Sequence, residues 1–168
     1  MLTTDQKGVV AEMAIAHAAL ELGVGVSRPL GDQRYDLILD FGAKLLRVQC
    51  KWASRHGDVV IVRCYSARRN TDGLVRRLYN RNEVDAFAAY RAELRCCYFL
   101  PFDYVPPGGT VQLRIAKSLN NQELGVRWAK QYEFAATLVN EKGAIAQLGE
   151  RRDGIAKGAG SSPAGSIA

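Results

Sequence analysis

Three polar side chains stand where their types and spacing could hold a metal ion beside a phosphate. Asp36 lies inside the apolar run 35–41, and Gln49 and Lys51 lie two residues apart in the apolar run 44–52. Residues two apart on a strand project from the same face. Such polar groups are costly to bury without a partner. Because Mg²⁺ prefers oxygen ligands and an ammonium stabilises phosphate charge, the trio predicts a divalent metal next to a phosphate.

A second carboxylate, Glu12, lies in segment 5–22, whose apolar residues recur with the spacing of an amphipathic helix. Asp36, Gln49 and Glu12 are the predicted metal ligands, and Lys51 is expected to orient a water or stabilise charge. Metal-assisted phosphodiester hydrolysis needs these roles. Taken singly, each residue has a plainer interpretation: a solvated helix charge, a strand-edge carboxylate, or part of an exposed strand face.

The order of these residues resembles the PD-(D/E)XK nuclease superfamily, and within it the small prokaryotic endonucleases that include group I intron homing endonucleases. The resemblance covers residues 7–135, and the stretches that carry it are 7–8 with Glu12, 34–38, 47–53, 83–90 and 97–101. It implies an α/β (α+β) restriction-endonuclease-like core, a mixed central sheet flanked by helices, and cleavage of double-stranded DNA with Mg²⁺ or Mn²⁺.

Under this resemblance Asp36 is the metal-binding aspartate and Lys51 is the motif lysine. Gln49 stands where many members of the superfamily carry Glu or Asp, so the site lacks one negative charge. A glutamine also occurs there in active relatives. Whether Asp36 and Glu12 alone hold the metal is the question on which catalysis depends.

The elements that position these residues follow from apolar patterning and turn residues. The helix over 5–22 is capped by Thr4 or Asp5 and ended by Gly23. Predicted strands cover 24–30, 35–41, 44–52, 59–65, 94–101 and 110–116. Segment 83–91 fits a short helix or the start of a strand, and 119–138 is helical in part.

A basic stretch separates the fourth and fifth of these strands. Residues 66–82 are predicted to form a basic loop or short helix, and the side chains expected to contact DNA phosphates are Arg68, Arg69, Arg76, Arg77 and Arg81. Asn70, Asn80 and Asn82 are available to base edges. The net charge of +6 also favours an anionic partner. The alternative is a solvated basic loop.

The chain divides by composition into an endonuclease domain over 1–142 and a tail over 143–168. The tail is rich in Gly, Ala and Ser, and too few large apolar groups occur there to offset its ordering entropy. Segments 146–151 and 160–163 back-translate to sequences typical of the D and T arms of tRNA. The tail therefore resembles a translated tRNA gene, and no catalytic residue is expected in it.

The four cysteines show neither Cys-x-x-Cys pairs nor zinc-ligand spacing with the two histidines, so we expect reduced, packed thiols. The sequence shows neither a membrane-spanning apolar stretch nor a signal peptide, which predicts a cytoplasmic protein.

The sequence thus predicts a metal-dependent DNA endonuclease of the homing type. A double-strand cut needs two active centres, so a homodimer or homotetramer is expected. Two alternatives stay open: a Holliday-junction-resolving or repair nuclease, and a catalytically silent DNA-binding module with the same fold.

Overall fold

The computed structural model describes residues 1–71, 73–117, 124–140 and 143. In chain order its elements are α1 (Thr4–Glu21), β1 (Gly25–Ser27), β2 (Leu37–Asp40), β3 (Leu45–Trp52), β4 (Ser54–His56), β5 (Val59–Arg63), β6 (Tyr65–Asn70), β7 (Gly73–Leu78), β8 (Ala86–Arg91), η1 (Ala92–Leu94), β9 (Cys96–Pro101), η2 (Phe102–Tyr104), β10 (Thr110–Arg114) and η3 (Ala129–Tyr132). Residues 134–140 are also helical. The tail predicted over 143–168 lies outside the described residues, except for Gly143.

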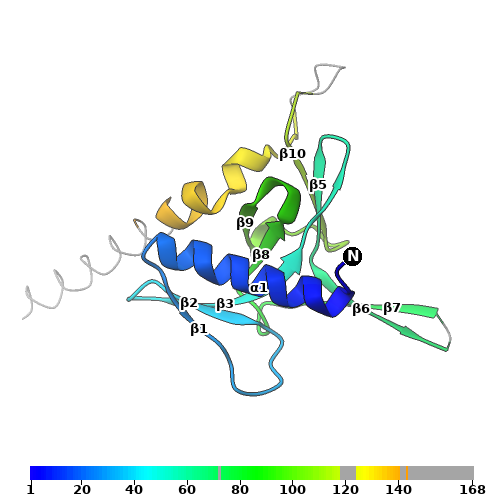
Figure 1. Ribbon diagram of the computed structural model, residues 1–168, viewed down its shortest axis with the longest axis horizontal. Helices are drawn as coiled ribbons and strands as arrows, with labels where there is room; N and C mark the ends of the chain where they lie inside the picture. Colours follow the sequence, from blue (N-terminus) through cyan, green and yellow to red (C-terminus); the bar gives the residue numbers. More distant parts are fainter. Residues whose placement is uncertain (72, 118–123, 141–142, 144–168) are drawn as a thin grey trace, which may run out of the picture.

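A five-stranded mixed sheet forms the centre of the molecule, in the order β1-β2-β3-β8-β9 (Figure 1). β3 and β8 run parallel, and the other neighbours run antiparallel. α1 and residues 134–140 pack on one face, and the smaller sheet β10-β5-β4 packs on the other. The predicted α/β class with a mixed central sheet is confirmed. Among the described elements, the α-helical segments flank one face of this sheet, and strands together with the short helices η2 and η3 cover the other.

Apolar and polar side chains alternate along β3, so one face of the strand packs into a core and the other carries the polar site residues. Leu46, Val48 and Cys50 are buried in the core beneath α1, whereas Gln49 and Lys51 are half-buried on the opposite face. Burying each large apolar side chain contributes about 1.5–3 kcal/mol. A register slip by one residue would expose these side chains and bury the polar ones, so the hydrophobic pattern fixes the position of Gln49 and Lys51.

The helix α1 begins one residue before the expected segment. Its N-cap is Thr3, whose side chain accepts from the backbone N–H of Gln6, and the Gln6 side chain reciprocates in a capping box. The cap was therefore predicted wrongly at Thr4 or Asp5. Gly23 follows the helix with a φ of 68°, which agrees with the predicted end. Among the described residues, no helix is long and apolar enough to cross a membrane.

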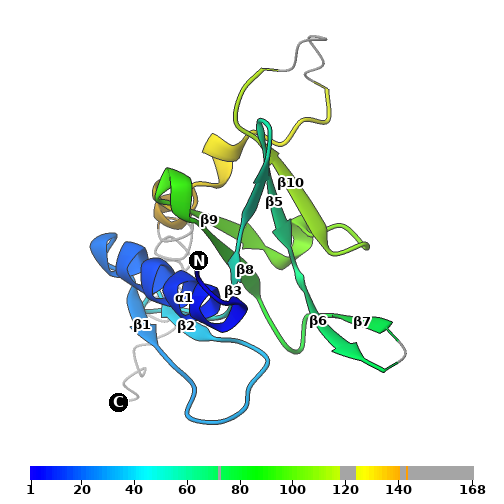
Figure 2. The same ribbon diagram turned by 45° about the vertical axis from the view of Figure 1, so that its right-hand side comes forward.

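The basic stretch 66–82 is neither a loop nor a helix over most of its length. β6 and β7 pair antiparallel and form a two-stranded ribbon that projects from the domain (Figure 2). Asn70 pairs with Gly73 across the turn, and Gly73 has a φ of 126° that a side chain would strain. The arginines misled the prediction because they are good helix formers, while the turn residues between two short strands indicate a hairpin.

Two further strands complete the comparison with the sequence, and for segment 83–91 the strand alternative is confirmed. Segment 83–91 contains β8, which is buried on both faces, so its sequence shows no alternation between apolar and polar residues. β4 was not predicted, because its three residues are polar or charged and half-buried or exposed.

The cysteines are free thiols, as predicted. Cys50, Cys64 and Cys97 are buried, and Cys96 is half-buried. Burial raises the pKa of Cys64 and of Cys97 to about 12. These thiols therefore stay protonated at neutral pH and pack as small apolar groups.

Candidate active site

Asp36 lies at a bend immediately before β2, where the pairing of β2 with β3 brings it to Gln49. Leu37 is opposite Val48 in the register, and the Asp36 backbone N–H donates to the Val48 carbonyl at 3.0 Å. The Asp36 Oδ2 accepts from the Cys50 backbone N–H at 2.7 Å and from the Gln49 Nε2 at 2.5 Å. The structure therefore brings Asp36 and Gln49 into direct contact.

The Gln49 amide nitrogen, rather than its oxygen, faces Asp36 in this structure. It donates to Asp36 Oδ2 and lies 3.4 Å from the Cys50 carbonyl. Gln49 thus supplies one of the two hydrogen bonds that Asp36 Oδ2 accepts. Rotating the amide by half a turn would present the oxygen that the sequence proposes as a metal ligand.

Lys51 extends from the same face of β3 as Gln49. Its Nζ donates to the Tyr65 carbonyl oxygen and to the Tyr79 hydroxyl, both at 3.3 Å, and lies 4.9 Å from the centre of the Tyr79 ring. Burial lowers the pKa of Lys51, while the charge of Asp36 opposes that shift. The ammonium and the Asp36 carboxylate therefore act on each other electrostatically.

Glu12 comes from α1, and its side chain is 20% exposed. Its Oε2 lies 2.5 Å from the Arg28 Nη2. Burial raises the pKa of Glu12, the charge of Asp36 raises it further, and Arg28 opposes both. Glu12 is thus close enough to Asp36 for the two carboxylates to repel each other.

The donor set fits a divalent cation. Burial raises the pKa of Asp36 even though Cys50, Lys51, Arg28 and Gln49 all favour its charged form. Burial disfavours the ionised form of both carboxylates, Asp36 and Glu12, and an added positive charge would stabilise that form. No group of three or more His, Cys, Asp or Glu side chains arranged for a metal occurs among the described residues. Two carboxylates and an amide suit Mg²⁺, which binds few protein ligands and retains several waters.

Arg47 projects from the same face of β3 as Gln49 but belongs to a different contact network. Its guanidinium makes two hydrogen bonds to Asp85, both at 2.9 Å, and donates to the carbonyls of Arg81 and Asn82. The hydrogen bond from Arg47 lowers the pKa of Asp85. Arg47 therefore anchors the turn before β8.

Three residues near the site were not singled out from the sequence as site residues: Arg28, Arg34 and Tyr79. The Arg34 guanidinium stacks on the Tyr79 ring at 4.1 Å and lies 3.3 Å from Glu83. The charge of Arg34 also contributes to the lowered pKa of Lys51. Arg34 lies two residues before the motif aspartate Asp36, and this proximity in sequence is the one feature from which its place near the site could have been predicted. Only the tertiary structure places Arg28 and Tyr79 here.

Four of the five predicted DNA-contacting arginines lie on the ribbon. Arg68 and Arg69 belong to β6, and Arg76 and Arg77 belong to β7. The Arg76 guanidinium lies 5.0 Å from the centre of the Tyr65 ring, and the Arg77 Nη2 lies 2.6 Å from Glu83. The ribbon therefore presents positive charge on both of its faces.

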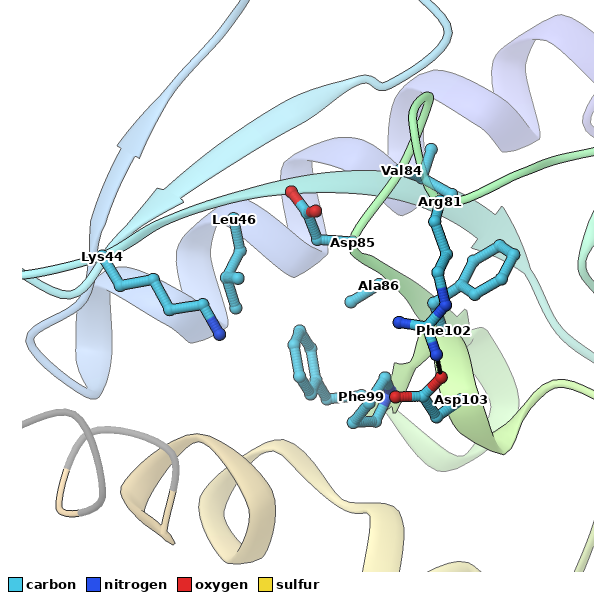
Figure 3. Close-up of a pocket in the computed structure, with 10 residues that line it drawn as sticks. Lys44, Leu46, Arg81, Val84, Asp85, Ala86, Phe99, Phe102 and Asp103 are labelled. Carbon is cyan, nitrogen blue, oxygen red and sulfur yellow. Dashed lines mark ion pairs between the residues drawn. The ribbon is translucent and has the colours of Figure 1, made fainter. Parts of the chain in front are cut away.

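Arg81 lies apart from the ribbon, at a cavity of about 320 Å³ (Figure 3). It forms an ion pair with Asp103, and its guanidinium lies 5.5 Å from the centre of the Phe102 ring. Lys44 and Arg81 reach into the cavity from opposite sides (Figure 3). None of the four predicted catalytic residues lines this cavity.

The comparisons with known proteins show the family and the fold. A family model described as PD-(D/E)XK endonuclease matches residues 2–135. Among solved structures, a bacterial homing endonuclease, I-Ssp6803I, is 31% identical, with a TM-score of 0.69 over 87% of this chain and 99% of that chain. No curated protein matches the chain.

Proposed function

The chain belongs to the PD-(D/E)XK endonuclease family, and from this premise we propose that it is a homing-type endonuclease that cleaves double-stranded DNA with Mg²⁺ or Mn²⁺. The likeness to a bacterial homing endonuclease over nearly the whole of that chain supports the homing type. The catalytic residues of the proposal are Glu12, Asp36, Gln49 and Lys51.

The observation that carries this proposal is the geometry around Asp36, whose Oδ2 contacts Gln49 and the Cys50 backbone N–H beside the carboxylate of Glu12. Asp36 and Glu12 come from a strand start and from α1, and burial disfavours the charge of both. Together with the Gln49 oxygen they would hold the metal. When bound, the ion supplies a Lewis acid that polarises the scissile phosphodiester.

Lys51 supplies the fixed positive charge of the site. Its ammonium is held by Tyr65 and Tyr79 within the electrostatic range of Asp36. A preoriented cation needs no reorganisation when negative charge develops on the phosphate, so it stabilises the transition state more than the ground state.

The ribbon is the proposed DNA-binding element. Arg68, Arg69, Arg76 and Arg77 would contact phosphates, and a two-stranded ribbon has dimensions that fit the major groove. Asn70 at the turn would reach base edges. Asn80, Arg81 and Asn82 follow the ribbon rather than belong to it. They would contact the DNA backbone or bases only where the DNA passes along the surface of the domain.

The assembly and the tail complete the proposal. A double-strand cut requires two active centres, so the functional form is a homodimer or a homotetramer. The catalytic domain covers residues 1–142, and the tail 143–168 contributes no catalytic residue. The protein works in the cytoplasm.

The deciding experiment incubates supercoiled plasmid and branched DNA with Mg²⁺ and the full-length protein. We expect linear product from the wild type. Asp36→Ala or Lys51→Ala should slow cleavage at least about a hundredfold, which is the rate cost typical of losing one group that stabilises charge in the transition state. Asp58→Ala, on the exposed turn before β5, is the matched control. Selective cutting of branched DNA would favour junction resolution.

Binding of DNA without cleavage under every metal would leave the catalytically silent module. The departure at Gln49, which removes one negative charge, is the observation that keeps this alternative in the test. Measuring DNA binding by mobility shift alongside cleavage separates the two outcomes.

A further inference from the structure

Arg28 stands directly after β1, at the carboxylate side of the candidate site. β1 pairs antiparallel with β2, and Ser27 is opposite Ile38. Continuing that register places residue 28 alongside the start of β2, where Asp36 lies. The pairing of β1 with β2 therefore positions the Arg28 guanidinium near the carboxylates of Glu12 and Asp36.

The side chain of Arg28 contacts one proposed metal ligand, Glu12, and acts electrostatically on a second, Asp36. Its Nη2 donates to Glu12 Oε2 at 2.5 Å. Its charge also favours the ionised form of Asp36. The Arg28 side chain is 66% exposed, so it can leave this position without disturbing either core.

Arg28 differs in this respect from Lys51, the other cation that acts on Asp36. Lys51 is held by two oxygen atoms at the base of the ribbon. Arg28 is held by Glu12, an oxygen ligand that the metal would need. Because a guanidinium and a divalent cation repel each other, the two cannot share Glu12 at equal strength.

We propose that Arg28 is an intramolecular counter-ion that pairs with Glu12 in the metal-free protein and competes with the divalent metal for that carboxylate. This inference rests on the proposed metal site and adds a residue that limits its affinity. Metal binding then requires Arg28 to release Glu12, which leaves the guanidinium free beside the site for a phosphate of the DNA.

The test measures Mn²⁺ binding by isothermal titration calorimetry on the full chain without DNA. Arg28→Gln should bind Mn²⁺ roughly five-fold more tightly than the wild type, the factor expected for the loss of one competing, partly exposed ion pair. Arg28→Lys, which keeps the charge, should stay within about two-fold of the wild type on the same scale. Arg55→Gln, which removes an exposed arginine of β4, is the matched control and should leave the affinity unchanged.

A double-mutant cycle with Glu12→Gln shows whether the competition acts through Glu12. If it does, Arg28→Gln tightens binding in the wild-type background and has little effect when Glu12 is already replaced. An equal gain in both backgrounds would mean general charge repulsion and would overturn the proposal. Unchanged or weaker binding by Arg28→Gln in a folded protein would overturn it as well.

The same titration separates this inference from the proposed function. If Mn²⁺ binds the wild type and Arg28→Gln equally, the counter-ion role fails and the metal site stands. If neither protein binds Mn²⁺, the metal site itself fails, and the counter-ion role fails with it. Thermal unfolding curves with and without Mn²⁺ verify that each variant is folded.

Discussion

The Lys51 ammonium lies 3.3 Å from the Tyr79 hydroxyl, and Tyr79 is the residue that directly follows the ribbon's second strand. The same ammonium donates to the carbonyl of Tyr65, the first residue of the ribbon. The proposed catalytic lysine is therefore held by both ends of the element that carries the arginines proposed to contact DNA. The position of Lys51 and the orientation of the ribbon depend on each other.

Tyr79→Phe removes the hydroxyl that accepts from Lys51 and keeps the ring on which Arg34 stacks. We expect single-turnover cleavage to slow about tenfold, the cost of losing a hydrogen bond to a charged group, while DNA affinity stays within about two-fold. Quench-flow cleavage and mobility-shift titrations measure the two quantities.

Tyr104→Phe is the control for that change, because Tyr104 is exposed and its ring packs against Tyr132 away from the site. A parallel loss of DNA affinity in Tyr79→Phe would mean that Tyr79 supports the ribbon rather than Lys51.

Asp36→Asn should make the metal-free protein more stable at neutral pH. Burial disfavours the charged carboxylate of Asp36, and an amide carries no such penalty. Urea unfolding in the presence of a chelator measures the free energy of unfolding. Saturating Mn²⁺ should reverse the order of the two proteins, because only the wild type retains the full ligand set.

The pH dependence of this difference follows from the raised pKa of Asp36. Between its ordinary pKa near 3.8 and the raised value, the native state binds more protons than the unfolded state. The stability contributed by this group is present at lower pH and is lost as pH rises through that window. The advantage of Asp36→Asn should therefore grow from pH 4 to neutral pH, and a pH-independent difference would contradict the assignment.

Gln49→Glu restores the carboxylate that many relatives carry. The new carboxylate would face Asp36, so we expect a less stable metal-free protein and metal affinity tighter on the order of tenfold, because ligand charge strengthens the binding of hard cations. Gln112→Glu, at an exposed position of β10, controls for added charge. Titration calorimetry with Mn²⁺ gives the affinity, and weaker binding by Gln49→Glu would remove residue 49 from the ligand set.

Replacing both Arg68 and Arg69 by Ala should flatten the dependence of DNA affinity on salt. Each phosphate contact contributes about 0.9 to the slope of log affinity against log salt, so the pair contributes about 1.8. Arg77→Ala should change the slope by less, because Arg77 is already paired with Glu83. Arg55→Ala is the control, and an unaltered slope in the double variant would exclude this part of the ribbon from the interface.

Arg47→Ala should destabilise the protein by about 2 kcal/mol, because Asp85 and two backbone carbonyls would lose charged hydrogen-bond donors. Arg55→Ala removes an exposed pair and should cost less than about 1 kcal/mol. Urea unfolding compares the two. Equal effects would show that the Arg47 network is no stronger than an ordinary surface ion pair.

The contact between Asp36 and Gln49 was predictable because it depends on period-two alternation and on one hairpin. Both are local properties of 35–52, and the buried face of β3 leaves a single register. Glu12 was proposed as a ligand because it is a carboxylate on the first helix, and the family resemblance supports it; nothing in helical spacing brings residue 12 toward Asp36.

Neither the strands of the ribbon nor the place of Arg28 at the site could be predicted from the hydrophobic pattern, for two different reasons. The ribbon strands are exposed and carry no hydrophobic alternation, so arginine content suggested a loop or a helix. Arg28 reaches the site through the packing of α1 over the sheet, a contact between residues 16 positions apart that no local signal records.

The described residues of β6 and β7 belong to neither hydrophobic core. Exchanges along the exposed strands of the ribbon therefore cost little folding free energy, typically within about 0.5 kcal/mol. If the ribbon contacts DNA as proposed, its exposed side chains can therefore change without loss of the fold, provided that the two contacts of Lys51 at its base are kept. The same separation makes the ribbon the natural segment to randomise when new target sites are selected in the laboratory.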